Sequence, residues 1–175
     1  MIKTALSQVE PDYFKVPTTY ELSGIVRERV FCYELYHQLR KLRNSKTTKL
    51  DLELNGEIDK RSHIDFDKKD RKNPDFVFHN PGTHERNTLV IEVKGKLHKR
   101  GIEKDFNTIS TFIEKYEYKA GIFILYNHSI QELTEKRGKE LKKFKKKLSA
   151  NRIYILTIKS PEENCKVSLL SKLHI

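Results

Sequence analysis

Two short apolar segments of this 175-residue chain are interrupted by charge, and this pattern constrains the fold more than any other feature. Pro74–His79 contains one carboxylate, Asp75, and Leu89–Lys94 contains Glu92 and Lys94. Both segments have the apolar pattern of strands. Burying a charge on a strand is costly unless the charge is paired or binds a metal ion. The pattern therefore predicts that folding brings these charged side chains together.

Strand geometry places Glu92 and Lys94 on one side. Successive side chains of a strand point to opposite faces, so residues two apart share a face. If the Asp75 strand pairs beside this one through the turn residues Asn80–Gly82, Asp75 can approach Glu92. Neighbouring carboxylates repel each other and favour a divalent cation, and oxygen ligands select Mg²⁺ or Mn²⁺. Two carboxylates and a lysine suit metal-assisted attack on a phosphodiester.

A third acid lies in a segment with helical periodicity. From about Tyr20 to Arg43 the apolar residues recur at helical spacing, and Glu28 lies in the middle of the apolar face. Ser23 or Thr19 is the expected N-cap of this helix. A buried acid in an apolar surrounding is a candidate functional residue. The alternative is a structural glutamate that pairs with an arginine or caps a backbone amide.

The remaining pattern predicts a single α/β domain over residues 1–175. We expect an irregular arm at 1–17, a strand at 50–54 and a hairpin turn at Asn55–Gly56. The other expected strands are 76–79, 88–94, 120–126, 152–158 and 166–170, and the other expected helices are 102–116 and 131–148. This order predicts a mixed sheet with helices on its faces.

Composition limits the cellular setting and the partners. The net charge of +11 favours nucleic acid as a partner. Cys32, expected in the core, and Cys165 are the two cysteines, which argues against a disulfide scaffold and fits a reducing compartment. The longest apolar run, Ala120–Tyr126, is too short to span a bilayer. We therefore expect a cytoplasmic protein with no membrane partner.

Taken together, these motifs resemble those of the PD-(D/E)XK nucleases, the restriction-endonuclease-like superfamily. The matching pieces are the helical Glu28, Asp75 after Pro74, and Glu92-Val93-Lys94. The flanking residues are similar to those of small bacterial members, and the resemblance covers about residues 22–127. It implies an αβββαβ core with a central mixed sheet flanked by helices.

The resemblance also implies roles for individual residues. Asp75 and Glu92 would hold Mg²⁺ or Mn²⁺, with the carbonyl oxygen of Val93 as a further ligand. Lys94 would orient or help deprotonate the attacking water and stabilise the developing phosphorane charge. Glu28 would orient water or support a second metal ion. The resemblance thus implies a hydrolase, a divalent-metal-dependent nuclease.

Several other polar residues have a functional and a structural interpretation. Asp105 is a further candidate beside the site, or a helix N-terminal acid favoured by the macrodipole. His79 shares the Asp75 face, and Glu53 and Glu57 are expected to face solvent. The lysine-rich stretch Lys136–Lys147 either binds backbone phosphates or is the solvated face of a helix.

The sequence thus supports three functional hypotheses. The first is a metal-dependent nuclease that acts on DNA, with a homodimer if both strands are cut. The second is a non-catalytic nucleic-acid-binding or protein-interaction module on the same fold. The third is a small defence or mobile-element component that works only with a partner chain.

Overall fold

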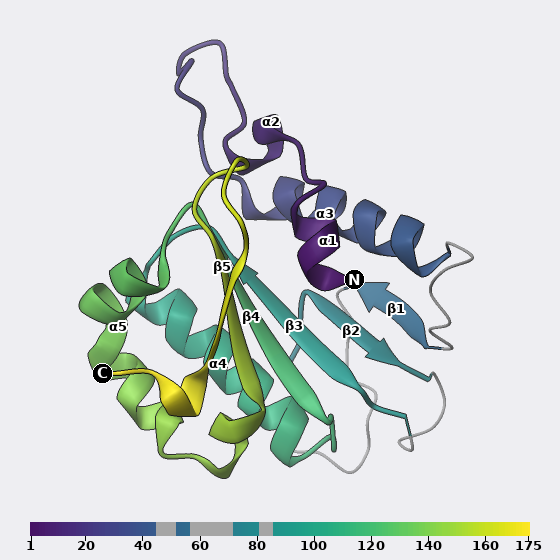
Figure 1. The fold of residues 1–175 in the computed structure, drawn as a ribbon, viewed down its shortest axis with the longest axis vertical. Coiled ribbons are helices and arrows are strands. Elements are labelled where there is room, and N and C mark those ends of the chain that lie inside the picture. Colours follow the sequence, from purple (N-terminus) through teal and green to yellow (C-terminus); the bar gives the residue numbers. More distant parts are fainter. Residues whose placement is uncertain (45–51, 57–71, 81–85) are drawn as a thin grey trace.

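The computed structural model of the chain describes residues 1–44, 52–56, 72–80 and 86–175, and Figure 1 shows their arrangement. The helices and strands follow one another in this order: α1 (Ile2–Leu6), α2 (Pro11–Phe14), α3 (Glu28–Arg43), β1 (Glu53–Gly56), β2 (Phe76–His79), β3 (Leu89–Lys94), α4 (Lys99–Glu114), β4 (Ala120–Tyr126), α5 (Ile130–Lys145), the 3₁₀ helix η2 (Leu148–Arg152), β5 (Ile153–Ile158), β6 (Lys166–Leu169) and the 3₁₀ helix η3 (Leu170–Lys172).

The strands form a six-stranded open sheet in the order β1-β2-β3-β4-β5-β6. The pairs β3–β4 and β4–β5 are parallel, and the other three pairs are antiparallel. The predicted α/β class with a mixed sheet is therefore confirmed. Within it, α3, β1, β2, β3, α4 and β4 follow one another as αβββαβ along the chain.

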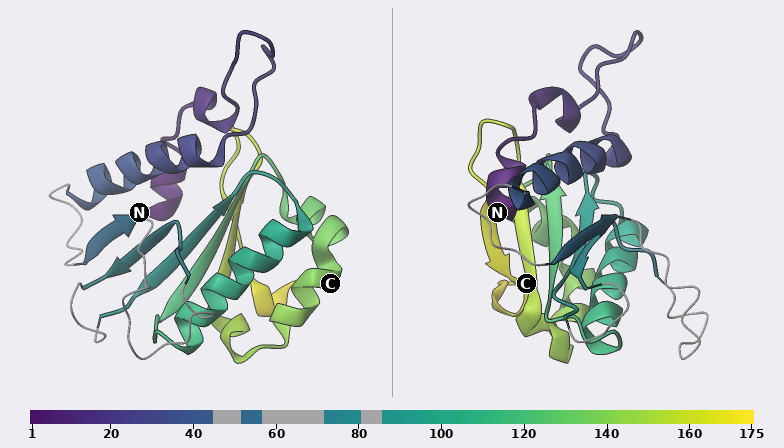
Figure 2. Two further views of the ribbon diagram at one scale, coloured as in Figure 1. Left: turned by 180° about the vertical axis from the view of Figure 1, so that it is seen from behind. Right: turned by 90° about the vertical axis from the view of Figure 1, so that its right-hand side faces the viewer.

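Helices cover both faces of this sheet, as the two views in Figure 2 show. Alternate strand residues divide between two cores. Val77 and Val90 pack in the core with α4 and α5, whereas Phe76 and Ile91 pack in the core with α1 and α3. By this alternation, Asp75, two residues before Val77, and Glu92, two residues after Val90, belong to the α4 face.

The N-terminal segment differs from the predicted irregular arm. It forms α1 and α2, and Leu6 and Phe14 are buried in the core beneath α3. Pro11 begins α2, in the first helical position where its missing N–H costs nothing. Helices of four or five residues show too little periodicity for the sequence to reveal them.

The third helix begins at Glu28 and not near Tyr20 as predicted, and neither Ser23 nor Thr19 caps it. The preceding residues form a hairpin instead, in which Val16 and Ile25 exchange backbone hydrogen bonds of 2.9 Å in both directions. Gly24 permits this turn because its φ of +78° lies in the left-handed region.

Two smaller predictions also fail. Asn55 and Gly56 lie within β1 and not in a turn, and they pair with Val77 and Phe76 of β2. Leu148, the last residue of the helix predicted at 131–148, lies outside α5, which ends at Lys145, and is 91% exposed. Residues 50, 51 and 57 fall outside the described part of the chain.

Within the described ranges, the structure contains no helix of the length and apolarity needed to cross a membrane.

Candidate active site

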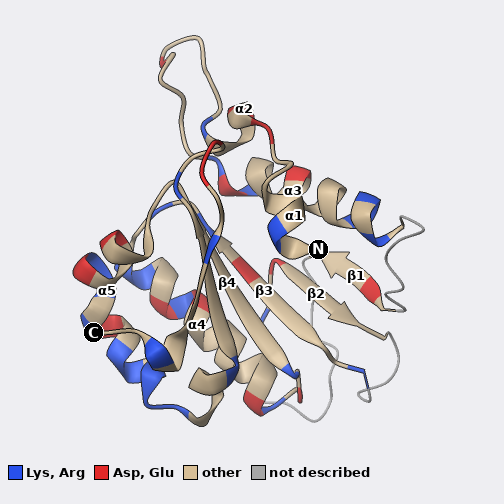
Figure 3. Ribbon diagram, viewed as in Figure 1, with Lys and Arg blue, Asp and Glu red and all other residues tan. Residues whose placement is uncertain are grey.

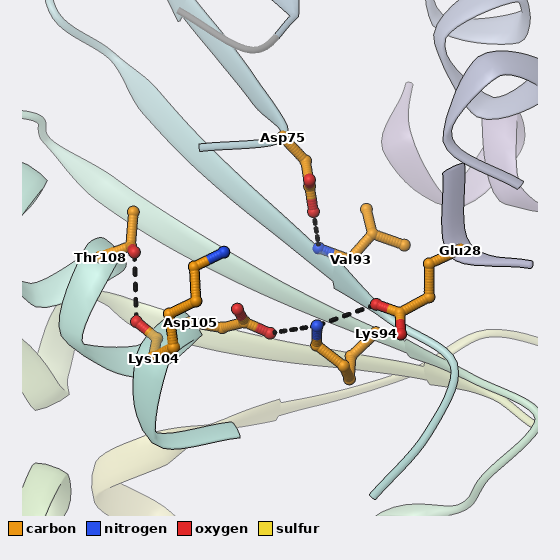
Figure 4. Close-up of polar contacts among 7 residues, drawn as sticks. All are labelled: Glu28, Asp75, Val93, Lys94, Lys104, Asp105 and Thr108. Carbon is orange, nitrogen blue, oxygen red and sulfur yellow. Dashed lines mark hydrogen bonds and ion pairs between the residues drawn. The ribbon is translucent and has the colours of Figure 1, made fainter. Parts of the chain in front are cut away.

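Asp75 occupies the point where the β2–β3 ladder ends. The last pair joins Phe76 to Ile91, so the Val93 N–H lies beyond the end of β2. The side chain of Asp75 supplies the acceptor that a longer β2 would have provided, and the Val93 N–H donates to its Oδ2 at 2.7 Å (Figure 4). This contact fixes the Asp75 carboxylate against β3 at the level of Glu92. An aspartate directly before β2 can therefore continue the hydrogen bonding to β3 with its side chain.

Glu92 is a nearly inaccessible acid on a central strand, with 2% of its surface exposed. Burial raises its pKa well above the ordinary 4.5, and the neighbouring carboxylates of Asp75 and Asp105 raise the pKa further. Burial also raises the pKa of Asp75, while the Val93 N–H, Lys94 and a hydrogen bond with Glu92 lower it. Both carboxyl groups are therefore harder to ionise than free carboxylic acids, and a cation between them would favour their charged forms.

Lys94 links the sheet to the helices on either side of the site. Its Nζ lies 2.8 Å from Glu28 Oε2 and 3.0 Å from Asp105 Oδ2 (Figure 4). Burial alone would lower the pKa of Lys94, but Asp105 and Glu28 raise it by more, so the net pKa lies above the ordinary value. Lys94 is therefore a fixed ammonium group at neutral pH.

Asp105 belongs to the same charged group as Lys94, which its place in the sequence does not reveal. Only 1% of the residue is exposed, and its carboxylate is paired with Lys94. Burial raises its pKa to about 6, against the lowering effect of Lys94. The macrodipole interpretation is wrong because Asp105 lies in the second turn of α4, which begins at Lys99.

These groups line a cavity of about 710 Å³ between α3, α4 and the ends of β2 and β3. The cavity lining includes all of the predicted site residues, namely Glu28, Asp75, Glu92, Val93 and Lys94. One face of α3 lies along the same cavity. It carries four lining residues at helical spacing, namely Arg29, Cys32, Tyr33 and Tyr36. Cys32 is half-buried there and not sealed in the core as predicted, and burial raises its thiol pKa.

The donor set is small for an all-protein metal site. The described residues hold no group of three or more His, Cys, Asp or Glu side chains arranged around a common point. Glu28 and Asp105 each direct an oxygen to Lys94. Asp75 and Glu92 remain as the adjacent pair, and Glu92 Oε1 has no hydrogen-bond partner in the described structure.

The other polar candidates lie outside the cavity. His79 Nε2 is hydrogen-bonded to Asn55 Oδ1 at 3.0 Å, which ties β2 to β1. Glu53 is exposed, as predicted, and Glu57 is outside the described residues. The lysines of α5, prominent in Figure 3, are partly engaged in structural contacts. Lys143 pairs with Glu103 at 3.2 Å, and Lys145 Nζ donates to the Leu173 carbonyl oxygen.

Comparison with known proteins adds no assignment, since no family model, curated protein or solved structure matches the chain. Any functional conclusion for this chain therefore depends on the motifs and on the geometry of this site.

Proposed function

We propose that the protein is a divalent-metal-dependent nuclease that hydrolyses phosphodiester bonds, with DNA as its substrate. In this proposal α3, β1–β3, α4 and β4 form a restriction-endonuclease-like core. The single observation that carries the proposal is the state of Glu92. This acid is buried beside Asp75, has an oxygen without a partner, and adjoins a lysine held as an ammonium group.

The residues present fit a hard divalent cation. Mg²⁺ is commonly bound in proteins by one or two carboxylates, with water and substrate phosphate completing its octahedral shell. Asp75 and Glu92, with the Val93 carbonyl oxygen, would hold the ion in this protein. A bound Mg²⁺ or Mn²⁺ would supply a water of lowered pKa and neutralise charge on the phosphate oxygens. The cation would also relieve the repulsion between the two carboxylates.

The protein's own groups divide the remaining work. The Lys94 ammonium group can donate hydrogen bonds to a phosphate oxygen or to the attacking water and so stabilise developing negative charge. Its raised pKa in the metal-free protein favours the ammonium form, so in this proposal it orients water and stabilises charge. Asp105 is a positioning residue, since it acts by holding Lys94. Glu28, whose side chain is 34% exposed, is the acid best placed to contact water in the cavity.

Charge over the whole chain supports a nucleic-acid substrate. The net charge of +11 attracts a polyanion even though the site itself is rich in acids. Lys104 and Arg29 contribute positive charge to the cavity lining. A basic protein with a recessed acidic site suits a substrate that is bound through its backbone and cut at the metal ion.

The test is a cleavage assay with labelled single-stranded DNA, double-stranded DNA and RNA in Mg²⁺, in Mn²⁺ and in EDTA. We expect metal-dependent cleavage by the wild type. Asp75→Asn, Glu92→Gln and Lys94→Met should each reduce the rate by at least about 100-fold. Glu53→Gln is the matched control, because Glu53 is an exposed strand acid outside the cavity.

Two results would count against the proposal. Cleavage that survives in Asp75→Asn and Glu92→Gln would remove these residues from the reaction. Salt-dependent binding of nucleic acid without cleavage in any metal would favour a non-catalytic binding module.

A further inference from the structure

The cavity that contains the charged cluster also has an aromatic lining. Tyr36 is fixed there, because its hydroxyl donates to the Leu54 carbonyl oxygen at 3.3 Å and its ring stacks on Phe76 at a centroid distance of 6.0 Å. Tyr33, on the same face of α3, is 65% exposed. An exposed aromatic ring at the opening of a charged cavity can bind a planar ligand.

The charged groups of Lys94 and Glu92 in the cavity are much less exposed than this ring. The side chain of Lys94 is 15% exposed, and Glu92 is 2% exposed. A phosphate must therefore enter the cavity to reach Lys94. The volume of about 710 Å³ lies within the range of small-molecule sites, so it can hold a nucleotide unit. A base-paired duplex keeps its bases stacked inside the helix, where they cannot contact a side chain in such a cavity.

We propose that the cavity binds one unpaired nucleotide of single-stranded nucleic acid, with its base stacked on Tyr33 and its phosphate directed towards Lys94. This inference rests on the proposed function for the position of the phosphate, and it adds the class of substrate. Stacking on tyrosine is tolerant of sequence, because every base has a π-face. The preferred substrate is therefore a single strand, or a frayed or unpaired stretch of a duplex, with little sequence selectivity.

Binding without metal tests the inference separately from cleavage. Fluorescence anisotropy in EDTA would compare a labelled oligothymidylate strand with a duplex of the same length. We expect wild-type protein to bind the single strand more tightly. Tyr33→Ala should weaken single-strand binding by about 5- to 150-fold, the range expected for loss of one base–aromatic stack. Tyr33→Phe, which keeps the ring, should bind like the wild type.

Tyr154→Ala is the matched control, because Tyr154 is a partly exposed tyrosine of β5 outside the cavity lining. It should leave the affinity unchanged. The fluorescence of a strand that carries 2-aminopurine should be quenched on binding to the wild type and to Tyr33→Phe, since stacking quenches the emission of this base. Circular dichroism should show that all variants are folded, as expected for changes at exposed positions.

The outcomes separate this inference from the proposed function. If Tyr33→Ala binds the single strand as well as the wild type, or if the wild type prefers the duplex, the stacking site is wrong while the nuclease proposal stands. If single-strand binding depends on Tyr33 but no metal supports cleavage, the nuclease proposal fails and the nucleotide site stands. Absence of any binding to the single strand would overturn the inference.

Discussion

Replacing Glu92 by glutamine should make the metal-free protein more stable, although Glu92 is a proposed metal ligand. Burial and two neighbouring carboxylates raise the pKa of Glu92 in the folded state above 4.5, so the folded protein keeps a proton that the unfolded chain releases. The free energy of unfolding must then fall as pH rises from about 4.5 to the folded-state pKa. Below pH 4.5 both states are protonated and the cost disappears.

The free energy of unfolding lost through the raised pKa of Glu92 has an upper limit. An acid with a raised folded-state pKa lowers the free energy of unfolding by about 1.4 kcal/mol per pH unit. This loss begins at the unfolded-state pKa and ends at the folded-state pKa or at the working pH, whichever is lower. At pH 7 this interval begins at 4.5 for Glu92, so the cost cannot exceed about 3 kcal/mol. Glutamine keeps the size of the side chain and can still donate to Asp75. We therefore expect Glu92→Gln to raise the free energy of unfolding by about 1–3 kcal/mol at pH 7.

Urea unfolding in EDTA from pH 5 to pH 8 measures this effect. The difference between Glu92→Gln and wild type should grow as pH rises, whereas Glu53→Gln, an exposed control, should show no such trend. Added Mg²⁺ should stabilise the wild type and leave Glu92→Gln unchanged. A variant that is less stable than wild type at every pH, or a difference independent of pH, would refute the reasoning that burial and the neighbouring carboxylates raise the pKa of Glu92.

Three further predictions concern the same region. Lys94→Met should lower the free energy of unfolding by about 2 kcal/mol at pH 8, because Asp105 loses its partner. Without Lys94 the pKa of Asp105 lies above its wild-type value of about 6, so the loss should shrink as pH falls towards 6 and Asp105 takes up a proton. Adding Asp105→Asn should recover part of the loss, and no recovery would contradict the pairing. Gly95→Ala should cost about 1–3 kcal/mol in urea unfolding, because its Cβ would lie 2.4 Å from the Tyr126 ring, whereas Gly138→Ala in α5 should be neutral or stabilising, with a Cβ contact of 3.7 Å. Mg²⁺ should raise the melting temperature of the wild type but not that of Asp75→Asn, and equal shifts in both would place the cation elsewhere.

The sequence predicted the central strands well because their signals are local. The run Ala120–Tyr126 is continuously apolar, and it forms β4 with those limits. Helix α3 was extended too far towards the N-terminus because the apolar spacing continues through Leu22 and Ile25. That spacing belongs to a hairpin, which depends on the left-handed Gly24 and on cross-strand hydrogen bonds. Periodicity alone does not distinguish the two.

The residues of the candidate site were predicted in part, because only some of their positions follow from local sequence. Alternation along β3 fixed the shared direction of Glu92 and Lys94, and the antiparallel partner brought Asp75 to the same level. The pairing of Asp105 with Lys94 was missed because it depends on how α4 packs over β3, which no local pattern encodes. The position of Tyr33 in the cavity lining was missed for the same reason, although Tyr33 lies one helical turn after Arg29, which also lines the cavity.

The most direct test of the metal site is an anomalous diffraction measurement on crystals of this protein soaked in Mn²⁺. We expect one strong anomalous peak between the carboxylates of Asp75 and Glu92, close to the Val93 carbonyl oxygen, and no such peak in Glu92→Gln crystals. Fully occupied Mn²⁺ elsewhere, with Asp75 and Glu92 still hydrogen-bonded to each other, would show that these two acids do not form the metal site.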